Sequence, residues 1–333
     1  MSLARVRDYH ARIDRLRKVS GSTLETVLRT SFQRLLEDWS EAEGLVFAPE
    51  LPLTTGAGKG RVPDGTVLHD IRIPHGYWEA KDADDDLDAE IAKKRAVGYP
   101  IANIIFEDTK TAVLFQDGKE AMRCAMADAE DLHRLIDAFF RWEPAVIQEW
   151  RAAVRQFQQD LPLVLDELRE RIDEAYAGNA TFRDKADAFL AHARETVNPN
   201  LAEADIREML IQHILTESIF ARVFDDGTFH QTNNIARELY ALESLFLAGV
   251  EKNAMLKGLK PYYAAIEHAA GEITDHGEKQ TFLKVIYEGF YQSYNPAAAD
   301  RLGVVYTPNE IVRFMVRGAD WLCQRHFGKR LAA

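Results

Sequence analysis

Three charged side chains in one short stretch could form a metal-dependent hydrolytic site. Asp64 stands in a Pro-Asp-Gly turn, and Glu79 and Lys81 flank Ala80 further along the chain. Side chains on a strand alternate between its faces, so Glu79 and Lys81 point the same way if this segment is extended. Two carboxylates suit a hard divalent cation, and a lysine beside them can orient or deprotonate a water and offset charge on a phosphate. The residue types therefore indicate metal-assisted hydrolysis.

A hairpin is expected to bring these groups together. The Pro-Asp-Gly turn leads into an expected strand over Thr66–Ile73, and Pro74-His75-Gly76 is expected to reverse the chain. A second strand is predicted over Tyr77–Lys81. This arrangement places Asp64 alongside Glu79.

Two alternatives stay open from the residues alone. Asp70 also precedes Glu79 at a suitable distance and could be the first carboxylate, although the Pro-Asp-Gly context favours Asp64. The same residues could also form a solvated hairpin in which Lys81 pairs with Glu79 on the surface. Such a pair would contribute little free energy.

Asp64 followed by Glu79-Ala80-Lys81 resembles the active site of the PD-(D/E)xK nuclease superfamily. The resemblance implies that Asp64, Glu79 and the backbone carbonyl of Ala80 bind Mg²⁺ or Mn²⁺, and that Lys81 assists the attacking water. In this superfamily the helix before the sheet often carries an active-site glutamate, and Glu25 stands at the corresponding place. The helix dipole alone also favours an acidic residue in a first helical turn.

The surrounding segments predict a small mixed β-sheet flanked by helices, the α+β fold that the resemblance implies, over residues 1–142. Lys93 and Lys94 close an expected helix that ends at Val97, where they can face the site. The expected order is helix, three strands, helix, two strands and a closing helix. Apart from the hairpin, its strands and closing helix are Leu45–Leu53, Asn103–Glu107, Thr111–Phe115 and Glu120–Phe140.

The rest of the chain predicts an all-helical domain over residues 143–300, because strand signals vanish and amphipathic stretches separated by Gly, Asn and Pro take over. No repeat of fixed period is present. The expected helices are Ala145–Gln158, Leu161–Tyr176, Phe182–Thr196, Glu203–Phe224, Asn234–Leu247, Tyr262–Ile273 and Thr281–Tyr294.

The segment Gly303–Met315, with Tyr306-Thr307-Pro308, resembles the lead-in to the catalytic domain of adenine-N6 DNA methyltransferases of restriction–modification systems. In that family this turn opens a helix and lies against S-adenosylmethionine, so these three residues are expected to contact the cofactor in the full-length enzyme. Thr307 as N-cap and Pro308 at N1 would also start a helix without any such function.

The methyltransferase family continues with a glycine-rich loop and an Asn-Pro-Pro-Tyr motif, and this chain contains neither. Residues 301–333 are therefore expected to begin a truncated methyltransferase domain. The resemblance implies that the methyltransferase and the target-recognition domains lie C-terminal to this chain. No Walker sequence occurs, which favours an ATP-independent, type II-like fusion of nuclease and methyltransferase.

The composition is that of a folded protein with an acidic balance. The 333 residues, 47% of them hydrophobic, can form two cores or one large one. A net charge of −12 argues against a broad DNA-coating surface but leaves room for a local basic groove. Two distant cysteines without metal-ligand spacing indicate reduced thiols and a cytoplasmic protein. No apolar run reaches the ~18 residues of a membrane span.

The leading hypothesis is an Mg²⁺-dependent endonuclease domain acting on double-stranded DNA and joined by a helical spacer to a methyltransferase. The fragment alone is expected to cut poorly or without specificity. The alternative is a non-catalytic module, in which the nuclease fold survives as a DNA-contacting or structural part of a DNA methyltransferase.

Overall fold

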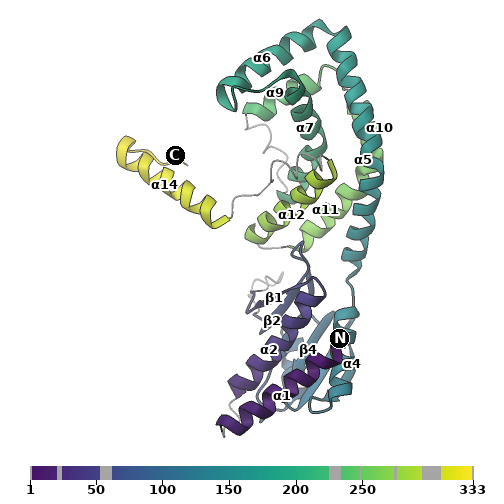
Figure 1. The fold of residues 1–333 in the computed structure, drawn as a ribbon, viewed down its shortest axis with the longest axis vertical. Coiled ribbons are helices and arrows are strands. Elements are labelled where there is room, and N and C mark those ends of the chain that lie inside the picture. The colour runs from purple at the N-terminus through teal and green to yellow at the C-terminus, as the bar shows by residue number, and fades with distance from the viewer. Residues whose placement is uncertain are drawn as a thin grey trace. The chain divides into compact units, whose positions relative to one another are not determined.

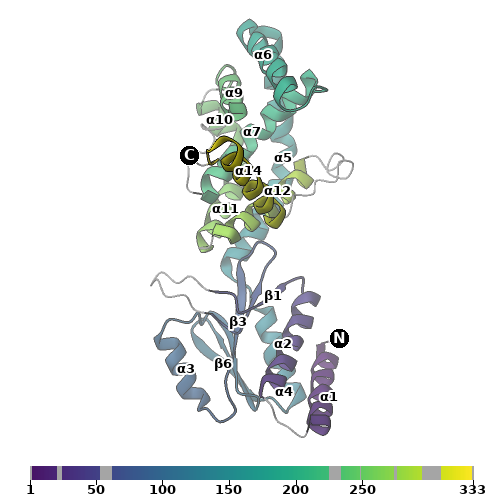
Figure 2. The ribbon, with the colours of Figure 1, turned by 90° about the vertical axis from the view of Figure 1, so that its left-hand side faces the viewer.

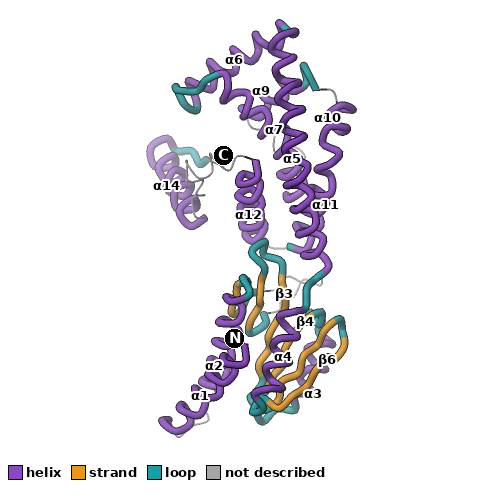
Figure 3. The backbone as a smooth tube through the Cα atoms, turned by 45° about the vertical axis from the view of Figure 1, so that its right-hand side comes forward, coloured by secondary structure: helices purple, strands orange, loops and turns teal. Residues whose placement is uncertain are grey.

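The computed structural model describes residues 2–20, 25–52, 62–224, 234–247, 249–273, 276–294 and 309–331. The chain divides into two compact units, Met1–Val285 and Ile286–Ala333. The first unit contains the β-sheet and most of the helices (Figures 1 and 3). No helix of these described ranges is both long and apolar enough to cross a membrane.

A six-stranded mixed sheet forms the centre of the N-terminal part. Its strands lie side by side in chain order, and every neighbouring pair is antiparallel except β3 and β4. A parallel pair requires a crossover connection, and helix α3 (Leu87–Ala96) provides it. The strands are β1 (Val46–Pro49), β2 (Gly65–Leu68), β3 (Pro74–Ala80), β4 (Asn103–Glu107), β5 (Thr111–Gln116) and β6 (Lys119–Ala125).

Helices cover both faces of this sheet (Figure 2). Helices α1 (Ser2–Ser20), α2 (Glu25–Ala42) and α4 (Ala129–Arg141) pack on one face, where Trp78 and Phe139 are fully buried. Helix α3 packs on the other face in a smaller cluster with Ile104 and Phe106. The alternation of β3 therefore sends Trp78 into the larger core and its neighbour Glu79 to the face that carries α3.

The reversal before β3 differs from the predicted one. The predicted strand Thr66–Ile73 ends at Leu68, and the chain turns at residues 69–72, where Arg72 N donates to His69 O at 2.9 Å. Pro74-His75-Gly76, predicted as the turn, forms the beginning of β3. Proline is tolerated at the first residue of a strand, and Arg72 adopts the left-handed conformation with φ 64° that the tight turn requires.

The predicted helix Glu120–Phe140 is wrong in its first part. Asp117 and Gly118, both at positive φ, form a tight turn after β5, and β6 then pairs with β5. The helix begins only at Ala129, after the side chain of Asp128 accepts hydrogen bonds from the N–H groups of Glu130 and Asp131. These residues have good helix propensity but form a strand, because they pair with the otherwise open edge of β5.

The helical half of the chain (residues 143–331) contains no strand among its described residues, as predicted, but several helix bounds differ from the predicted ones. The two helices predicted from Ala145 to Tyr176 are one helix, α5 (Ala145–Gly178), which contains Pro162. The short α10 (Gly249–Met255) and η1 (Leu256–Leu259) were not predicted. The remaining elements are α6 (Ala180–Thr196), α7 (Glu203–Phe224), α9 (Asn234–Glu243), α10 (Gly249–Met255), η1 (Leu256–Leu259), α11 (Lys260–Glu272), α12 (His276–Tyr294) and α14 (Asn309–Phe327).

The division expected at residue 142 falls in the connection between α4 and α5. The boundaries at residues 142 and 300 stay predictions. In the second unit, α14 exposes large apolar side chains, among them Phe314, Trp321 and Phe327.

Gly76 tests the packing that places β3. A Cβ at this position would lie 2.6 Å from the Phe139 ring and 2.7 Å from Asn103 Nδ2. Since both neighbours are buried, we expect Gly76→Ala to lower the free energy of unfolding by about 1–3 kcal/mol. Gly178→Ala, where a Cβ would meet nothing within 4 Å, is the matched control and should change it by less than about 1 kcal/mol. Equal urea midpoints for the two variants would contradict this packing.

Candidate active site

The pairing of β2 with β3 brings Asp64 beside Glu79. The register joins Gly65 to Trp78 and Thr66 to Tyr77, so Asp64, the residue before β2, lies opposite Glu79 when the register is continued by one residue. Directly opposed residues of an antiparallel pair have Cβ atoms about 5 Å apart. Asp64 Oδ2 also accepts a hydrogen bond from the N–H of Ala80 at 2.8 Å. The carboxylate of Asp64 is thereby fixed at the end of β3.

Glu79 is a buried carboxylate held by two lysines. Its side chain is only 3% exposed, and Oε1 accepts a hydrogen bond from Lys81 Nζ at 2.7 Å and pairs with Lys94 Nζ. Burying a charge costs several kcal/mol unless opposite charges and hydrogen bonds compensate it, and the two ammonium groups do so on one oxygen. Oε2 is buried and has no hydrogen-bond partner. One carboxylate oxygen of Glu79 therefore remains available to a ligand.

Asp64 is more exposed and carries its own cation. Its Oδ1 pairs with the guanidinium of Arg29 from α2, and its side chain is 18% exposed. Burial, followed by the neighbouring carboxylate of Glu79, raises the pKa of Asp64, while the Ala80 N–H, Arg29 and Lys81 act in the opposite direction. A divalent cation placed between two neighbouring carboxylates would reduce the repulsion between them.

Lys94 reaches the site from α3 and Tyr99 orients it. Lys94 Nζ donates to the hydroxyl of Tyr99 at 3.0 Å, and this hydroxyl donates to the carbonyl of Val62 at 3.2 Å. Burial by itself would lower the pKa of Lys94, but hydrogen bonds to Glu79 and Tyr99 outweigh it and raise the pKa. Lys94 is therefore a charged partner of Glu79. Lys93, the other lysine expected to face the site, instead pairs with Glu90 on the surface.

The other predicted residues do not join this cluster. Asp70 lies in the turn at the opposite end of the β2–β3 hairpin, where its Oδ1 accepts the N–H of Ile71 at 2.8 Å. Glu25 begins α2, but its side chain lies outside the described part of the chain, as do Tyr306, Thr307 and Pro308. From α2, the residue placed at the site is Arg29, one turn after Glu25.

Sequence reasoning missed Arg29 and Tyr99. Arg29 stands one helical turn from the expected glutamate, which was an available signal, since residues four apart share a helix face. Tyr99 follows the glycine that ends α3, and no local pattern marks it. Its role depends on the return of the chain from α3 towards β4.

The oxygens at this end of β3 fit a hard divalent cation. In the described part of the chain, each carboxylate has its own cationic partners: Asp64 pairs with Arg29, and Glu79 pairs with Lys81 and Lys94. Residues of an antiparallel pair exchange N–H and C=O bonds on the same side, so the carbonyl of Ala80 lies on the edge where its N–H meets Asp64. Oxygen ligands from Asp64, Glu79 Oε2 and the Ala80 carbonyl are those that Mg²⁺ prefers.

A third carboxylate lies at the end of β4. Glu107 is 1% exposed, and its Oε2 accepts the N–H of Thr109 at 2.7 Å. Burial raises the pKa of Glu107 to about 7. Glu107 pairs with Ala80 in the parallel register and follows Phe106, so its side chain leaves the sheet on the face away from Glu79.

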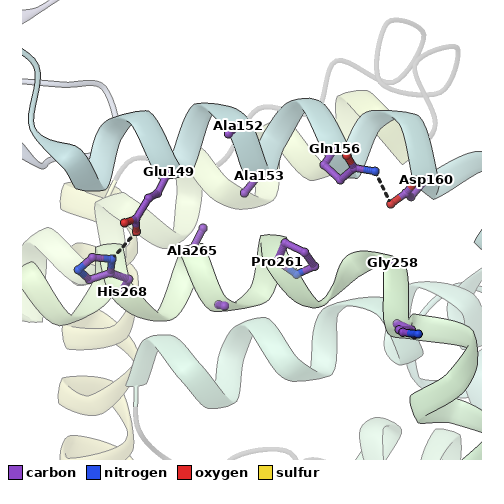
Figure 4. A pocket seen from close by; sticks show the side chains of 11 residues that line it. Glu149, Ala152, Ala153, Gln156, Asp160, Gly258, Pro261, Ala265 and His268 are labelled. Carbon is purple, nitrogen blue, oxygen red and sulfur yellow. Dashed lines mark hydrogen bonds and ion pairs between the residues drawn. The ribbon is translucent and has the colours of Figure 1, made fainter.

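An open cavity of about 890 Å³ lies between α5 and the η1–α11 segment (Figure 4). Small side chains form its floor, including Ala152, Ala153 and Ala265. Its polar groups bond to one another at the rim, as His268 Nδ1 and Glu149 Oε2 do at 2.8 Å. The cavity thus offers shape but no converging set of free polar groups.

His213, Glu217 and Glu243 form a second cluster with metal-ligand chemistry in the helical half, their ligand atoms lying within 4.8 Å of one another. Lys252 Nζ pairs with a carboxylate oxygen of Glu217 and bonds Glu243 Oε1 at 2.7 Å. The cluster therefore contains its own bridging cation, unlike the pair Asp64 and Glu79. It ties α7, α9 and α10 together.

Comparisons with known proteins match part of the chain to one family model. Residues 154–278 match the family model for the coupler domain of Type ISP restriction-modification enzymes. This range covers most of α5 and continues into the first turn of α12. A search of curated proteins found no match.

Solved structures give a likeness over the whole chain. A chain in the cryoEM structure of a DrdV–DNA complex is 46% identical, with a TM-score of 0.57, and the match covers 100% of this chain and 33% of that one. This chain thus spans about a third of the length of the DrdV chain.

Two further structures match more weakly. They are a nuclease-deletion mutant of the Type ISP restriction-modification enzyme LlaGI with a DNA substrate mimic, and the ATP-dependent Type ISP enzyme LlaBIII bound to DNA. Their identities are 24% and 20%, their TM-scores 0.40 and 0.37, and the matches cover 53% and 69% of this chain and 14% of each of theirs. These values are too low to carry an argument about this chain.

The pKa of Glu107 predicts a pH-dependent stability. Because its pKa rises from 4.5 to about 7 on folding, the folded protein holds this proton more tightly, and the free energy of unfolding falls as pH rises through that window. Glu107→Gln, which mimics the protonated form, should therefore be more stable than the parent at pH 8 by about 1–3 kcal/mol and equal to it at pH 4.

Urea unfolding at the two pH values measures this difference. Glu130→Gln, at an exposed position, is the control and should behave as the parent at both. A Glu107→Gln variant that loses stability equally at pH 4 and pH 8 would show that the carboxylate, not the acid, is the buried form.

Proposed function

We propose that this chain is the N-terminal part of a restriction–modification enzyme and that it carries an Mg²⁺-dependent, PD-(D/E)xK-type DNA endonuclease site. The observation that carries the proposal is the placement of Asp64 opposite Glu79, with a buried, unpartnered oxygen of Glu79 and a lysine two residues later. The 46% identity to a DrdV chain solved with DNA, over the full length of this chain, supports DNA as the substrate.

The helical half has a different role in this proposal. The coupler match at residues 154–278 supports a spacer that joins the endonuclease to the modification domain. We infer that the enzyme also contains an adenine-N6 methyltransferase and a target-recognition domain, because Gly303–Met315 resembles the lead-in to such a methyltransferase. Tyr306, Thr307 and Pro308 would then contact S-adenosylmethionine there. We propose a type II-like fusion of the two activities; these 333 residues themselves contain no Walker sequence.

The residues divide the work of phosphodiester hydrolysis between them. Asp64, Glu79 and the Ala80 carbonyl would hold Mg²⁺ or Mn²⁺, which supplies positive charge against the phosphate and lowers the pKa of a bound water. Lys81, fixed by its bond to Glu79, is placed to orient the attacking water and to offset charge that develops on the phosphate. Lys94 pairs with the buried carboxylate of Glu79 and holds it in position.

One observation favours a second function. The carboxylates of Asp64 and Glu79 are already neutralised by Arg29, Lys81 and Lys94. A non-catalytic module that contacts DNA or positions the methyltransferase would need nothing more. Calorimetric titration with Mn²⁺ separates the two functions, because such a module should bind no Mn²⁺ that depends on Asp64 and Glu79.

Substitutions at the hairpin test the nuclease site. In the full-length protein with Mg²⁺, Asp64→Asn, Glu79→Gln and Lys81→Ala should each slow plasmid cleavage by at least about 100-fold, because metal binding or water activation is lost. Asp70→Asn, in the turn at the other end of the hairpin, is the matched control and should cut at the parent rate. Unchanged cutting by Lys81→Ala would remove this lysine from the mechanism.

A further inference from the structure

Arg29 approaches the site from the other face of the sheet. Helix α2 buries Leu28 and Phe32 in the core on that face, which leaves Arg29 at the rim. Its guanidinium carbon lies 6.0 Å from the centre of the Trp78 ring and its head group pairs with Asp64. Helix α2 and the Trp78 ring thus limit the positions that the Arg29 guanidinium can reach.

Arg29 has the most exposed side chain of the three cations that pair with these carboxylates. Its side chain is 36% exposed, against 13% for Lys81 and 23% for Lys94. The two lysines share the buried oxygen of Glu79, and Lys94 is tied to Tyr99 as well. The bond that the structure records for the guanidinium of Arg29 is to Asp64.

A divalent ion bound at Asp64 would change the charge balance around Arg29. Two carboxylates face three cationic side chains, so a divalent ion bound to Asp64 would leave a large positive excess beside the guanidinium. Arg29 and that ion would also compete for the same carboxylate. A DNA phosphate brings the negative charge that relieves this excess, and the planar fork of a guanidinium matches two phosphate oxygens.

We propose that Arg29 is a phosphate-binding residue of this site, which pairs with Asp64 in the absence of metal and donates to a phosphate of double-stranded DNA once a divalent cation takes Asp64. The inference rests on the proposed nuclease function and adds to it a metal-dependent DNA contact. Binding of metal and of DNA are then coupled through one side chain, because the metal releases the group that holds the phosphate.

The salt dependence of DNA binding measures this contact. Each phosphate contact contributes about 0.9 to the slope of log affinity against log salt concentration. With Ca²⁺ as the probe ion and a short duplex as the ligand, Arg29→Gln in the full-length protein should reduce this slope by about 0.9, whereas in EDTA the slopes should be equal. Arg34→Gln, an exposed arginine of the same helix, is the control and should show no difference between Ca²⁺ and EDTA.

Two further variants sharpen the result. Asp64→Asn weakens the hold on Arg29 without metal, so adding Arg29→Gln to it should reduce the slope in EDTA as well. Arg29→Lys keeps the charge and should retain most of the slope while cutting more slowly, because a lysine cannot bind bidentately. For Arg29→Gln we expect about 100-fold slower single-turnover cleavage at saturating Mg²⁺, together with tighter Ca²⁺ binding in calorimetry.

A parent-like slope in Ca²⁺ for Arg29→Gln would overturn the inference, as would an equal loss of slope with and without Ca²⁺, which describes a fixed surface charge. A urea midpoint of Arg29→Gln equal to that of the parent shows that its loss of slope is not due to unfolding. If Asp64→Asn and Glu79→Gln abolish cleavage while Arg29→Gln matches the parent, this inference fails and the nuclease function stands. Cleavage that survives in all three variants would instead overturn the function.

Discussion

The structure of the site depends on one buried charge, the carboxylate of Glu79. A strand residue that points into a helix-covered face would ordinarily be apolar, as Ile104 and Phe106 are on the neighbouring strand. The carboxylate is stable there because Lys81, the residue after β3, and Lys94 from α3 bond the same oxygen. This explains why α3, which the parallel β3–β4 pair requires as a crossover, also carries a functional side chain. Helix α3 therefore both connects β3 to β4 and supplies a partner for Glu79.

The strand that carries Glu79 is constrained at its other end as well. Arg72, in the turn before β3, makes a two-pronged ion pair with Glu278 of α12. A guanidinium–carboxylate fork fixes orientation as well as distance. The left-handed backbone of Arg72 costs free energy that surrounding contacts must offset, and this pair is one of them. The hairpin is thus tied to the helical half at one end and forms the candidate site at the other.

The grouping of Asp64, Glu79 and Lys81 could be predicted from the sequence, because it depends on local rules for strands and turns. The spacing of Glu79 and Lys81 follows from strand alternation, and the Pro-Asp-Gly turn marked Asp64 without any knowledge of the fold. The misplaced reversal arose because Pro74 was read as a breaker, although proline is tolerated at the start of a strand. The Asp-Gly pair at residues 117–118 was a hairpin signal that pointed to β6, and the helix propensity of the following residues concealed it.

What could not be predicted depends on packing between distant segments. Arg29 meets Asp64 because α2 rests on the larger core at a particular rotation, which Phe32 and Trp78 set through their contact at 5.9 Å between ring centres. Helical spacing places Arg29 on the same helix face as Glu25, but it could not show that this face meets Asp64. The same packing gives the two carboxylates different surroundings: Glu79 is enclosed and held by two lysines, whereas Asp64 is partly exposed and pairs with Arg29. In the proposed metal site, a cation would approach from the Asp64 side, where Arg29 is the partner to be exchanged, and would meet Glu79 Oε2 as a ligand already in place. The proposed site thus depends on the asymmetry between the two carboxylates more than on their spacing.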